Sequence, residues 1–334
     1  MGLIAIAANP ASGRDIRRFV SSATVFNNRE KQNIVERIIL AAVNMGEHRV
    51  VIMPESYHFA TRINEHLVED FKVIEGGVVS EANMNYNNTP KDTMEFASYA
   101  ETINADVLIV LGGDGTSRMA AKGISNIPLI PISTGTNNVF PEVIEGTVAG
   151  ITAAAIASGK VDLESCCERC KVVDIYINGE WKDLALVDVV FSDYVYTGAK
   201  AIWQREDISR VVVTQCSPAS IGFSAILGAK YTITAEDDCG GVAECGLGKA
   251  NTKVSLAAGT VTPIEIVSHN KICLDKKEVF VMQKNGMLAL DGEREITYQA
   301  GDEIGICIRK AGPKKVNVRK VLEQAQKNGF FDIN

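Results

Sequence analysis

The first half of the chain alternates short apolar runs with longer amphipathic segments. The runs at 3–8 and 107–111 contain only aliphatic residues, and each one stops at a polar segment rich in turn-forming residues. Unbroken runs of this kind are typical of strands in a parallel sheet that is covered on both faces. In the segments between the runs, apolar residues recur at the spacing of one helix face. This pattern predicts a doubly wound parallel α/β domain over residues 1–160.

The elements of this domain follow from the apolar pattern and from its Pro and Gly residues. We expect strands at 3–8, 49–53, 107–111 and 128–132, and a further short strand at 72–74. We expect helices at 30–44, 57–69, 92–103, 116–123 and 142–158. Residues 80–91 are rich in Asn, Glu and Ser and are predicted to form an exposed loop.

After Gly159 the pattern changes to short β-type runs separated by turn signals. The runs are at 171–177, 184–191, 210–214, 231–234, 253–256, 264–267, 279–282, 287–290 and 303–307. Their close spacing predicts an antiparallel sandwich or stacked sheets as a β-rich second domain over residues 161–309. A terminal helix is predicted at 315–326, and we expect residues 310–334 to pack back on the first domain.

The composition and net charge indicate how many domains the chain has and which class of partner it binds. The chain has 334 residues, more than one hydrophobic core usually supports, so two domains are the default expectation. Its 34 Lys and Arg residues are outnumbered by 41 Asp and Glu residues, which gives a net charge of -7. This acidic balance argues against nucleic acid or an anionic membrane as the main partner, and it favours a small molecule.

The expected compartment follows from the N-terminus and the cysteines. No basic region precedes the first apolar run, so no secretory signal peptide is predicted, and no apolar stretch reaches transmembrane length. Eight cysteines lie between positions 166 and 307, and without a secretion signal they are expected to be reduced thiols. They do not form paired Cys-x-x-Cys motifs, so no metal ligands are assigned. We expect a cytoplasmic protein.

Three polar turns follow strands of the predicted parallel sheet. They are Asn9-Pro10-Ala11-Ser12-Gly13-Arg14, Gly112-Gly113-Asp114-Gly115-Thr116 and Ser133-Thr134-Gly135-Thr136-Asn137-Asn138. The carboxyl ends of parallel strands meet at one edge of the sheet, which is where such sheets bind ligands. We therefore expect the three turns to converge on one binding site.

The glycine turn around Asp114 has the chemistry of a phosphate site. Its three glycines carry no Cβ, so backbone amides at the start of the following helix are open to a polyphosphate. A carboxylate beside phosphates repels them unless it binds a metal ion or deprotonates a hydroxyl, and Asp114 is the acidic residue at the tip. A plain tight turn remains an alternative for this segment, and a plain strand-helix connection remains one for Ser12 to Arg14.

These turns, together with Asp291-Gly292-Glu293, resemble motifs of the superfamily of NAD kinases and diacylglycerol or sphingosine kinases. Within it, the chain is more closely similar to the ATP-NAD kinase-like proteins called acetoin catabolism protein X. The segment from Ala8 to Arg18 and the turn from Ser133 to Pro141 carry this closer likeness, which spans nearly the whole chain.

The resemblance implies two domains that hold the substrates between them, ATP as donor, Mg²⁺ as assisting ion, and a homo-oligomer. Asp114 matches the motif aspartate and would be the catalytic base, taking the proton from an acceptor hydroxyl such as the adenosine ribose 2′-OH of NAD. Phosphoryl transfer depends on positioning and charge neutralisation, which suits a site of glycines, hydroxyls and one carboxylate. The residues that the likeness assigns to cofactor binding are Asn9, Ser12, Gly13, Arg14, Gly112, Gly113, Gly115, Thr116, Thr134, Gly135, Thr136 and Asn137.

The same likeness assigns residues of the second domain to the substrate. These are Asp188, Ser220, Gly222, Ser224 and Asp291. Val187 stands where the family has an Asn, and because Val cannot hydrogen-bond to adenine or ribose, this departure weakens NAD as the acceptor. Asp-Gly is also a common hairpin turn, so a structural role remains an alternative for Asp291 and Gly292.

Two other functions remain open at this point. Asn9 to Gly13 and Pro131 to Asn138 are also similar to diacylglycerol kinases, which favours a lipid kinase. The acidic charge and the lack of an evident membrane-binding helix count against that function. Val187 and a loosely matched turn around Ser220 favour instead a nucleotide-binding regulatory protein, linked to acetoin catabolism and without catalysis.

Overall fold

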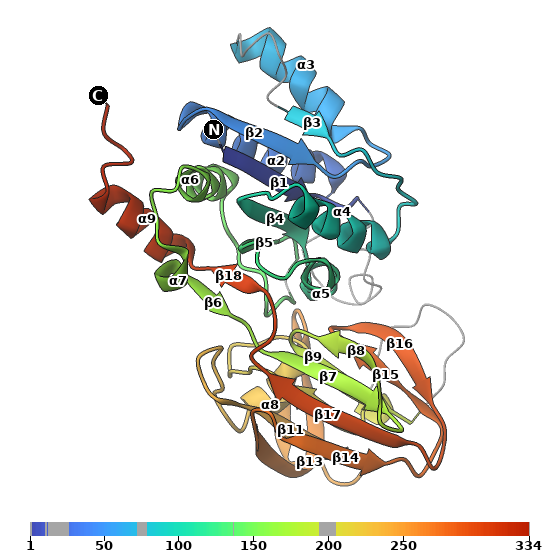
Figure 1. Ribbon diagram of the computed structural model, residues 1–334. Coiled ribbons are helices and arrows are strands. Elements are labelled where there is room, and N and C mark those ends of the chain that lie inside the picture. The colour runs from blue at the N-terminus through green and yellow to red at the C-terminus, as the bar shows by residue number, and fades with distance from the viewer. Residues whose placement is uncertain are drawn as a thin grey trace.

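The computed structural model of the chain describes residues 2–10, 12, 27–71, 79–135, 137–193 and 205–333, and Figure 1 shows its architecture. The first sheet has seven strands among the described residues, and the five from the N-terminal part of the chain run parallel in the order β3-β2-β1-β4-β5. These strands are β1 (Gly2–Ala7), β2 (His48–Ile52), β3 (Val79–Glu81), β4 (Val107–Gly112) and β5 (Leu129–Ser133). The order reverses between β1 and β4, and ligands of such sheets bind at this point.

Helices cover both faces of this sheet. On one face, α2 (Asn28–Asn44) packs against α6 (Gly146–Ala157), and α3 (Phe59–Phe71) adds Phe59 and Ile63 to the same core. On the other face lie α4 (Pro90–Thr102) and α5 (Asp114–Gly123). Side chains of β1 alternate between the two cores, because successive residues of a strand point to opposite faces. Burial on both sides explains why these strands contain no polar alternation.

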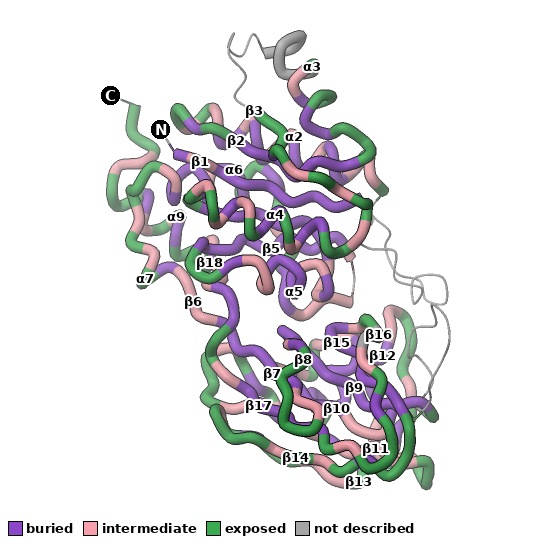
Figure 2. The backbone as a smooth tube through the Cα atoms, turned by 45° about the vertical axis from the view of Figure 1, so that its right-hand side comes forward, coloured by how far each residue is buried: buried purple, intermediate pink, exposed green. Residues whose placement is uncertain are grey.

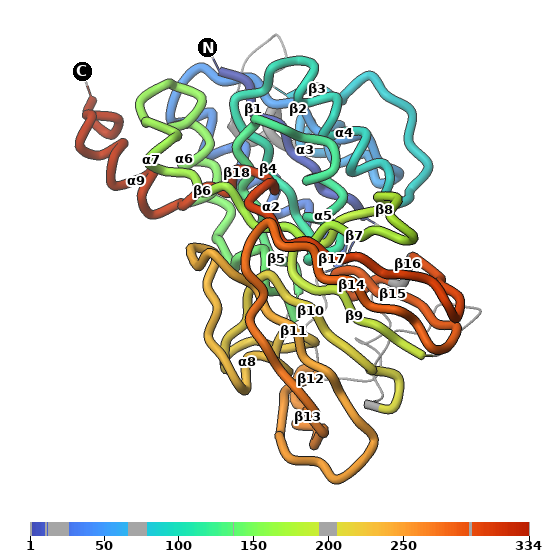
Figure 3. Tube along the Cα trace, turned by 60° about the horizontal axis from the view of Figure 1, so that its bottom comes forward, coloured from blue at the N-terminus to red at the C-terminus, as the bar shows by residue number. Residues whose placement is uncertain are grey.

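The C-terminal segment returns to the first sheet. β18 (Lys314–Val316) pairs in parallel with β5, and β6 (Cys167–Arg169) pairs with β18 in the antiparallel direction. The helix α9 (Val318–Lys327) follows and packs against α6 and the short helix α7 (Leu163–Cys166). Figures 1 and 3 both show α9 beside α6 and α7.

The remaining strands form two antiparallel sheets. The larger sheet has the order β12-β13-β11-β10-β9-β15-β16, and the smaller has the order β14-β17-β7-β8. Apolar residues of both sheets, such as Ile175, Phe191 and Ile306, form one shared core. Figure 2 shows the burial along these strands and the exposure of β13 and β14. The strands are β7 (Val172–Ile177), β8 (Glu180–Ala185), β9 (Asp188–Ser192), β10 (Arg210–Val213), β11 (Cys239–Gly246), β12 (Thr252–Ala257), β13 (Thr260–Cys273), β14 (Lys277–Val281), β15 (Gly286–Leu290), β16 (Glu293–Tyr298) and β17 (Glu303–Arg309), with the helices η1 (Arg205–Asp207) and α8 (Ser224–Gly228) between them.

The predicted fold class, a doubly wound α/β domain followed by a β-rich sandwich, is confirmed, but several element assignments were wrong. Residues 184–191 are the end of β8 and most of β9, because the N–H groups of Leu186 and Val187 bond to the Asp291 carboxylate and the chain turns there. Residues 231–234 form only one isolated β-bridge. The carbonyl oxygen of Tyr231 accepts a hydrogen bond from the Cys216 thiol, and that of Thr234 accepts one from the Lys171 ammonium group, so neither pairs with a neighbouring strand.

Other differences concern the strands that the pattern missed or misplaced. The third strand of the first sheet includes residues 80 and 81, which were predicted as loop, whereas the strand expected at 72–74 lies outside the described residues. β11 was missed because three glycines and a glutamate interrupt its apolar residues. β16 was missed because charged residues occupy its first three positions.

Candidate functional site

The glycine turn joins β4 directly to α5. Gly113 is the N-cap of α5 and provides no side-chain acceptor for the first amides of the helix. A Cβ at Gly113 would lie 2.8 Å from the amide oxygen of Asn138, and one at Gly115 would lie 2.7 Å from a carboxylate oxygen of Glu293. A Cβ at Gly112 would collide with the Thr116 side chain. The glycines therefore allow the turn to pack closely against the turn after β5 and against the second domain.

Asp114 connects this turn to the one that follows β5. Its Oδ1 accepts hydrogen bonds from the backbone N–H groups of Val139, at 3.1 Å, and Phe140, at 2.8 Å. Oδ2 lies 3.2 Å from the same N–H of Val139. The carboxylate is thus held in a fixed orientation, and its remaining lone pairs can accept further hydrogen bonds.

The turn after β1 is organised by a buried lysine that sequence analysis did not single out. Lys31 on α2 is 1% exposed, and its Nζ donates to the carbonyl oxygens of Asn9, at 3.0 Å, and Ser12, at 2.8 Å, and to Ser12 Oγ, at 2.9 Å. Ser12 Oγ lies 3.5 Å from the Leu111 carbonyl, next to the glycine turn. The expected neighbours Gly13 and Arg14 lie outside the described residues.

The turn after β5 also contacts the glycine turn. The N–H of Thr134 donates to the Gly112 carbonyl at 3.1 Å, and Asn138 Nδ2 donates to Ser133 Oγ at 2.8 Å. Ser133 Oγ in turn donates to the Gly135 carbonyl at 2.9 Å. The Oδ1 of Asn137 is buried without a hydrogen-bond partner among the described residues, and Thr136 lies outside them. The structure therefore brings the three polar turns together at one edge of the sheet.

A charged cluster fixes α5 to the second domain, and sequence analysis missed it. Arg118, one turn after Asp114, is fully buried and lies 3.2 Å from Asp183 on β8, 3.7 Å from Asp291 and 3.7 Å from Glu293. Lys122, four residues further on, pairs with the same Asp183 at 2.9 Å. The spacing of Arg118 and Lys122 on one helix face was visible in the sequence, but their acidic partners are distant in the chain.

Asp291 belongs to this buried cluster. Its oxygens accept hydrogen bonds from the N–H groups of Leu186, Val187 and Asp188, at 2.8, 2.7 and 3.1 Å. Burial raises the pKa of the Asp291 carboxyl, although Arg118 and the three amides lower it in part. Asp291 and Gly292 both have positive φ, at 48° and 83°, as in the two-residue hairpin turn that sequence analysis left as an alternative. The side chain supports the β8–β9 connection from inside the protein.

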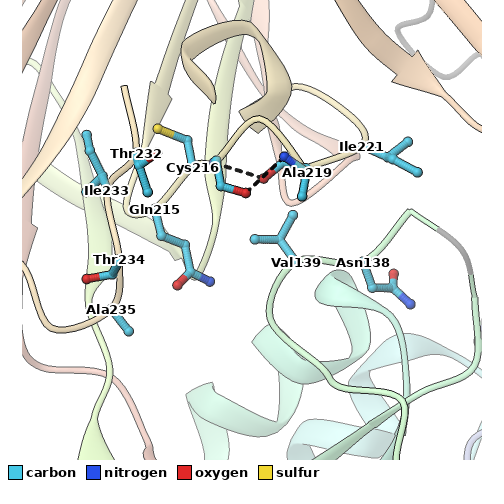
Figure 4. A pocket seen from close by; sticks show the side chains of 12 residues that line it. Asn138, Val139, Gln215, Cys216, Ala219, Ile221, Thr232, Ile233, Thr234 and Ala235 are labelled. Atoms are coloured by element: carbon cyan, nitrogen blue, oxygen red, sulfur yellow. Dashed lines mark hydrogen bonds between the residues drawn. The ribbon is translucent and has the colours of Figure 1, made fainter. Parts of the chain in front are cut away.

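A pocket of about 400 Å³ lies between the turn after β5 and the second domain (Figure 4). Among the residues assigned to the substrate, Ser220 lines it. Gly222, with φ of 107°, and Ser224, buried in α8, are not among the lining residues, and neither is Asp188, which is 6% exposed. The described residues that line the pocket are Asn138, Val139, Gln215, Cys216, Ser217, Ala219, Ser220, Ile221, Thr232, Ile233, Thr234 and Ala235.

Val187 has a structural explanation. It is fully buried in an apolar cluster that includes Ala120 of α5, Phe140 and Leu186. A polar side chain there would lose its hydration, so the valine suits the contact between the domains. Its position, and not a ligand, accounts for the apolar residue.

The described residues offer neither a metal cluster nor a membrane-spanning helix. Within the described ranges, no group of three or more His, Cys, Asp or Glu side chains could hold a metal ion. All eight cysteines are free, and burial raises the pKa of Cys170 to about 12, so its thiol stays protonated. No helix in the described part of the chain is long and apolar enough to cross a membrane.

Comparison with known proteins agrees with this architecture. Residues 5–161 match the family model described as the ATP-NAD kinase N-terminal domain, and residues 171–311 match the acetoin catabolism protein X C-terminal domain. Acetoin catabolism protein X of Cupriavidus necator is 29% identical over 331 residues, which cover 97% of this chain and 92% of that protein. The structure of yeast NADH kinase in complex with NADH has a TM-score of 0.53 and 11% identity, and the match covers 100% of this chain and 89% of that one.

At 11% identity the last likeness shows the fold alone, whereas the two domain matches follow one another along most of the chain. The first domain therefore matches the ATP-NAD kinase N-terminal domain and the second matches the acetoin catabolism protein X C-terminal domain, and nearly the whole chain is similar to acetoin catabolism protein X.

Proposed function

We propose that this protein is an ATP-dependent phosphotransferase that phosphorylates a hydroxyl of a small molecule bound between its domains. The observation that carries the proposal is the position of Asp114. Its carboxylate stands at the start of α5, where no side chain of the N-cap residue bonds the helix amides, and it is bonded to Val139, which lines the interdomain pocket. A base, an anion-binding helix terminus and an acceptor pocket are thereby adjacent.

In the proposed reaction, Asp114 takes the proton of the acceptor hydroxyl as its oxygen forms a bond to the γ-phosphorus of ATP. The bond from that phosphorus to the β,γ-bridging oxygen breaks, and ADP leaves. The amides at the start of α5, with Gly112, Gly113, Gly115 and Thr116, hold the phosphate oxygens. Asn9, Ser12, Thr134, Gly135 and Asn137 complete the nucleotide side, together with Gly13, Arg14 and Thr136.

Glu293 is the residue best suited to Mg²⁺. Its side chain is 46% exposed and lies against Gly115, so it faces the place proposed for the phosphates. Mg²⁺ is usually held by one or two carboxylates together with substrate phosphates, and when bound it neutralises their charge. Asp114 is the other carboxylate at this turn.

The acceptor that the family likeness suggests is NAD or a related nucleotide. Support comes from the ATP-NAD kinase N-terminal domain and from the fold shared with a NADH kinase. An acceptor panel with ATP labelled at the γ-phosphate and mass identification of the product would test this.

Asp114→Asn tests the proposed base. Since Asn keeps the size and one acceptor oxygen but cannot take the proton, transfer should fall by about 10²–10⁴-fold. Calorimetric binding of ATP and the melting temperature should stay near those of the parent protein, and Asp332→Asn, an exposed aspartate, should change nothing. Full turnover by a folded Asp114→Asn protein would show that another group is the base.

A second candidate function is nucleotide binding without catalysis. It is favoured by the contacts of Asp114, because a carboxylate that accepts two backbone N–H groups also has a purely structural use. ATP binding without a phosphorylated product from any acceptor of the panel would support this candidate against the first.

A further inference from the structure

The pocket between the domains has an unusual lining for a site that would take a dinucleotide. None of its twelve described lining residues carries a charge. They combine two side-chain amides, four hydroxyls and one thiol with five small or branched apolar side chains. A dinucleotide carries two phosphates, which proteins normally bind with Arg, Lys or several free amides. We infer that this pocket holds an uncharged, hydroxyl-rich acceptor, an inference that rests on the proposed phosphotransferase function.

Two polar side chains of the pocket are free to bond a ligand. The Gln215 amide and the Thr232 hydroxyl form no hydrogen bond with any described residue. An amide donates two hydrogen bonds and accepts through its oxygen, and a hydroxyl both donates and accepts, so together they match neighbouring hydroxyl groups. Figure 4 shows Gln215 and Thr232 on neighbouring segments of the pocket wall.

The other hydroxyls of the second-domain wall each form a hydrogen bond within the protein. Ser220 Oγ accepts from the Ser217 N–H at 3.1 Å, and Ser217 Oγ accepts from the Ala219 N–H at 3.2 Å. Thr234 Oγ1 donates to Asp237 at 2.9 Å. These bonds help to fix the two segments of the wall, and we assign recognition to Gln215 and Thr232, whose side chains form no hydrogen bond with a described residue.

The cation beneath this wall does not serve a ligand phosphate. Lys171 is 3% exposed, and its Nζ donates to the carbonyl oxygens of Thr234, Asp237 and Cys239, at 2.7, 3.1 and 2.6 Å. An ammonium group has three N–H donors, so these bonds use all of them. Its charge therefore stabilises the turn that carries Thr234 and Ala235, and the described lining of the pocket carries no charged side chain.

The segment around Val187, which the family likeness assigns to dinucleotide binding, cannot bind a dinucleotide in this protein. Val187 is buried in the apolar contact between the domains, and the N–H groups of residues 186–188 are all bonded to Asp291. The pocket adjoins the proposed base through Val139, which lines it and donates its N–H to Asp114, although Asp114 itself is not among the described lining residues. In the proposed arrangement, a hydroxyl bound beside Val139 is the one that transfers its proton to Asp114 and is phosphorylated by ATP.

An acceptor comparison tests the inference. The full-length protein with Mg²⁺ and γ-labelled ATP is given glycerol, erythritol, xylitol and dihydroxyacetone as uncharged acceptors, and NAD and dispersed diacylglycerol as competitors. We expect at least one uncharged acceptor to be phosphorylated tenfold or more faster than NAD or diacylglycerol. Faster transfer to NAD or to the lipid would overturn the inference and leave the proposed function standing, whereas no product from any acceptor would overturn both.

Two pocket variants test the assignment of the recognition groups. Gln215→Leu and Thr232→Val should each raise KM for the best uncharged acceptor about tenfold and leave KM for ATP unchanged. Thr260→Val is the matched control, because Thr260 is exposed on β13 and lies outside the pocket. An unchanged KM for the acceptor in both pocket variants would show that the acceptor binds elsewhere.

Discussion

The wall of the pocket that comes from the first domain is built differently from the wall that comes from the second. On the first side, turns that follow β1, β4 and β5 are bonded to one another through Ser12, Asp114 and Thr134. On the second side, residues 215–221 and 232–235 belong to no named strand or helix and are held by local side-chain bonds. The first wall carries the groups proposed for phosphate chemistry, and the second carries those proposed for acceptor choice.

A buried lysine supports each wall in a similar manner. Lys31 Nζ donates hydrogen bonds to three oxygen atoms of the turn that contains Asn9 and Ser12. Lys171 Nζ donates to three carbonyl oxygens of the segment from Thr234 to Cys239. Both therefore hold a turn by placing a buried ammonium group among oxygen atoms of the backbone and, for Lys31, of the Ser12 side chain. The described backbone of Asn9, Ser12 and residues 234–239 is thus held by hydrogen bonds within the protein, which lowers the entropic cost of binding a ligand there.

Of the changes proposed here, breaking the charged contact between the two walls should lower the free energy of unfolding the most. Arg118→Met removes a buried guanidinium and leaves Asp183 and Asp291 without their main buried cation, which should destabilise the protein by about 3–5 kcal/mol. The free energy of unfolding in urea, followed by circular dichroism, measures this loss. Arg319→Met is the matched control, since Arg319 is an exposed arginine on α9. A loss below about 1 kcal/mol would show that the cluster contributes little to the contact between the domains.

The two lysines allow the functions of the walls to be separated. Lys31→Met and Lys171→Met each leave buried carbonyl oxygens without donors, so each should cost about 1–3 kcal/mol of stability. Their kinetic effects should differ: Lys31→Met should raise KM for ATP, and Lys171→Met should raise KM for the acceptor. Steady-state kinetics below the melting temperature of both variants measures the difference. If both variants changed the same KM, the division of roles between the walls would be wrong.

The difference in construction between the two walls also explains which of their residues could be predicted from the sequence. The elements around the first wall were predicted because unbroken aliphatic runs such as Val107 to Leu111 can hardly be other than buried strands, and their polar turns necessarily meet at one edge. The residues of the second wall gave no such pattern. Thr232 lies in a run with β-type composition that makes a single bridge, and Gln215 follows a strand without any motif.

Arg118 and Lys31 were missed for another reason. Each looks like an ordinary polar residue of an amphipathic helix, and burial becomes visible only when distant segments come together. Asp183 and Asp291 lie 65 and 173 positions from Arg118, so no local spacing links them. The contacts of Asp291 with the N–H groups of residues 186–188 could likewise not be predicted from its Asp-Gly motif, since these partners lie more than 100 positions away.

The smallest expected effect is a pH dependence of the free energy of unfolding. It arises from the Asp183 carboxylate, which lies where the two domains meet. Although burial raises its pKa, the hydrogen bond from Lys122 and the charge of Arg118 outweigh burial and hold the pKa below its ordinary value. The folded protein therefore binds this proton more weakly than the unfolded chain does. The carboxylate's contribution to stability is complete above the unfolded pKa of about 3.9 and disappears as the pH falls through the lowered folded value.

Asp183→Asn tests this sign. At pH 7 the variant should be less stable than the parent protein in urea unfolding, by about 1–2 kcal/mol, because Lys122 and Arg118 lose a charged partner. The difference should shrink as the pH falls below about 3.9, because the unfolded parent chain then binds a proton that the folded carboxylate binds more weakly. Asp332→Asn should show no such trend, since that exposed carboxylate contacts neither domain partner. A difference that stayed constant from pH 7 to pH 3 would mean that Asp183 acts through its shape and hydrogen bonds, and that charge does not hold the two walls together.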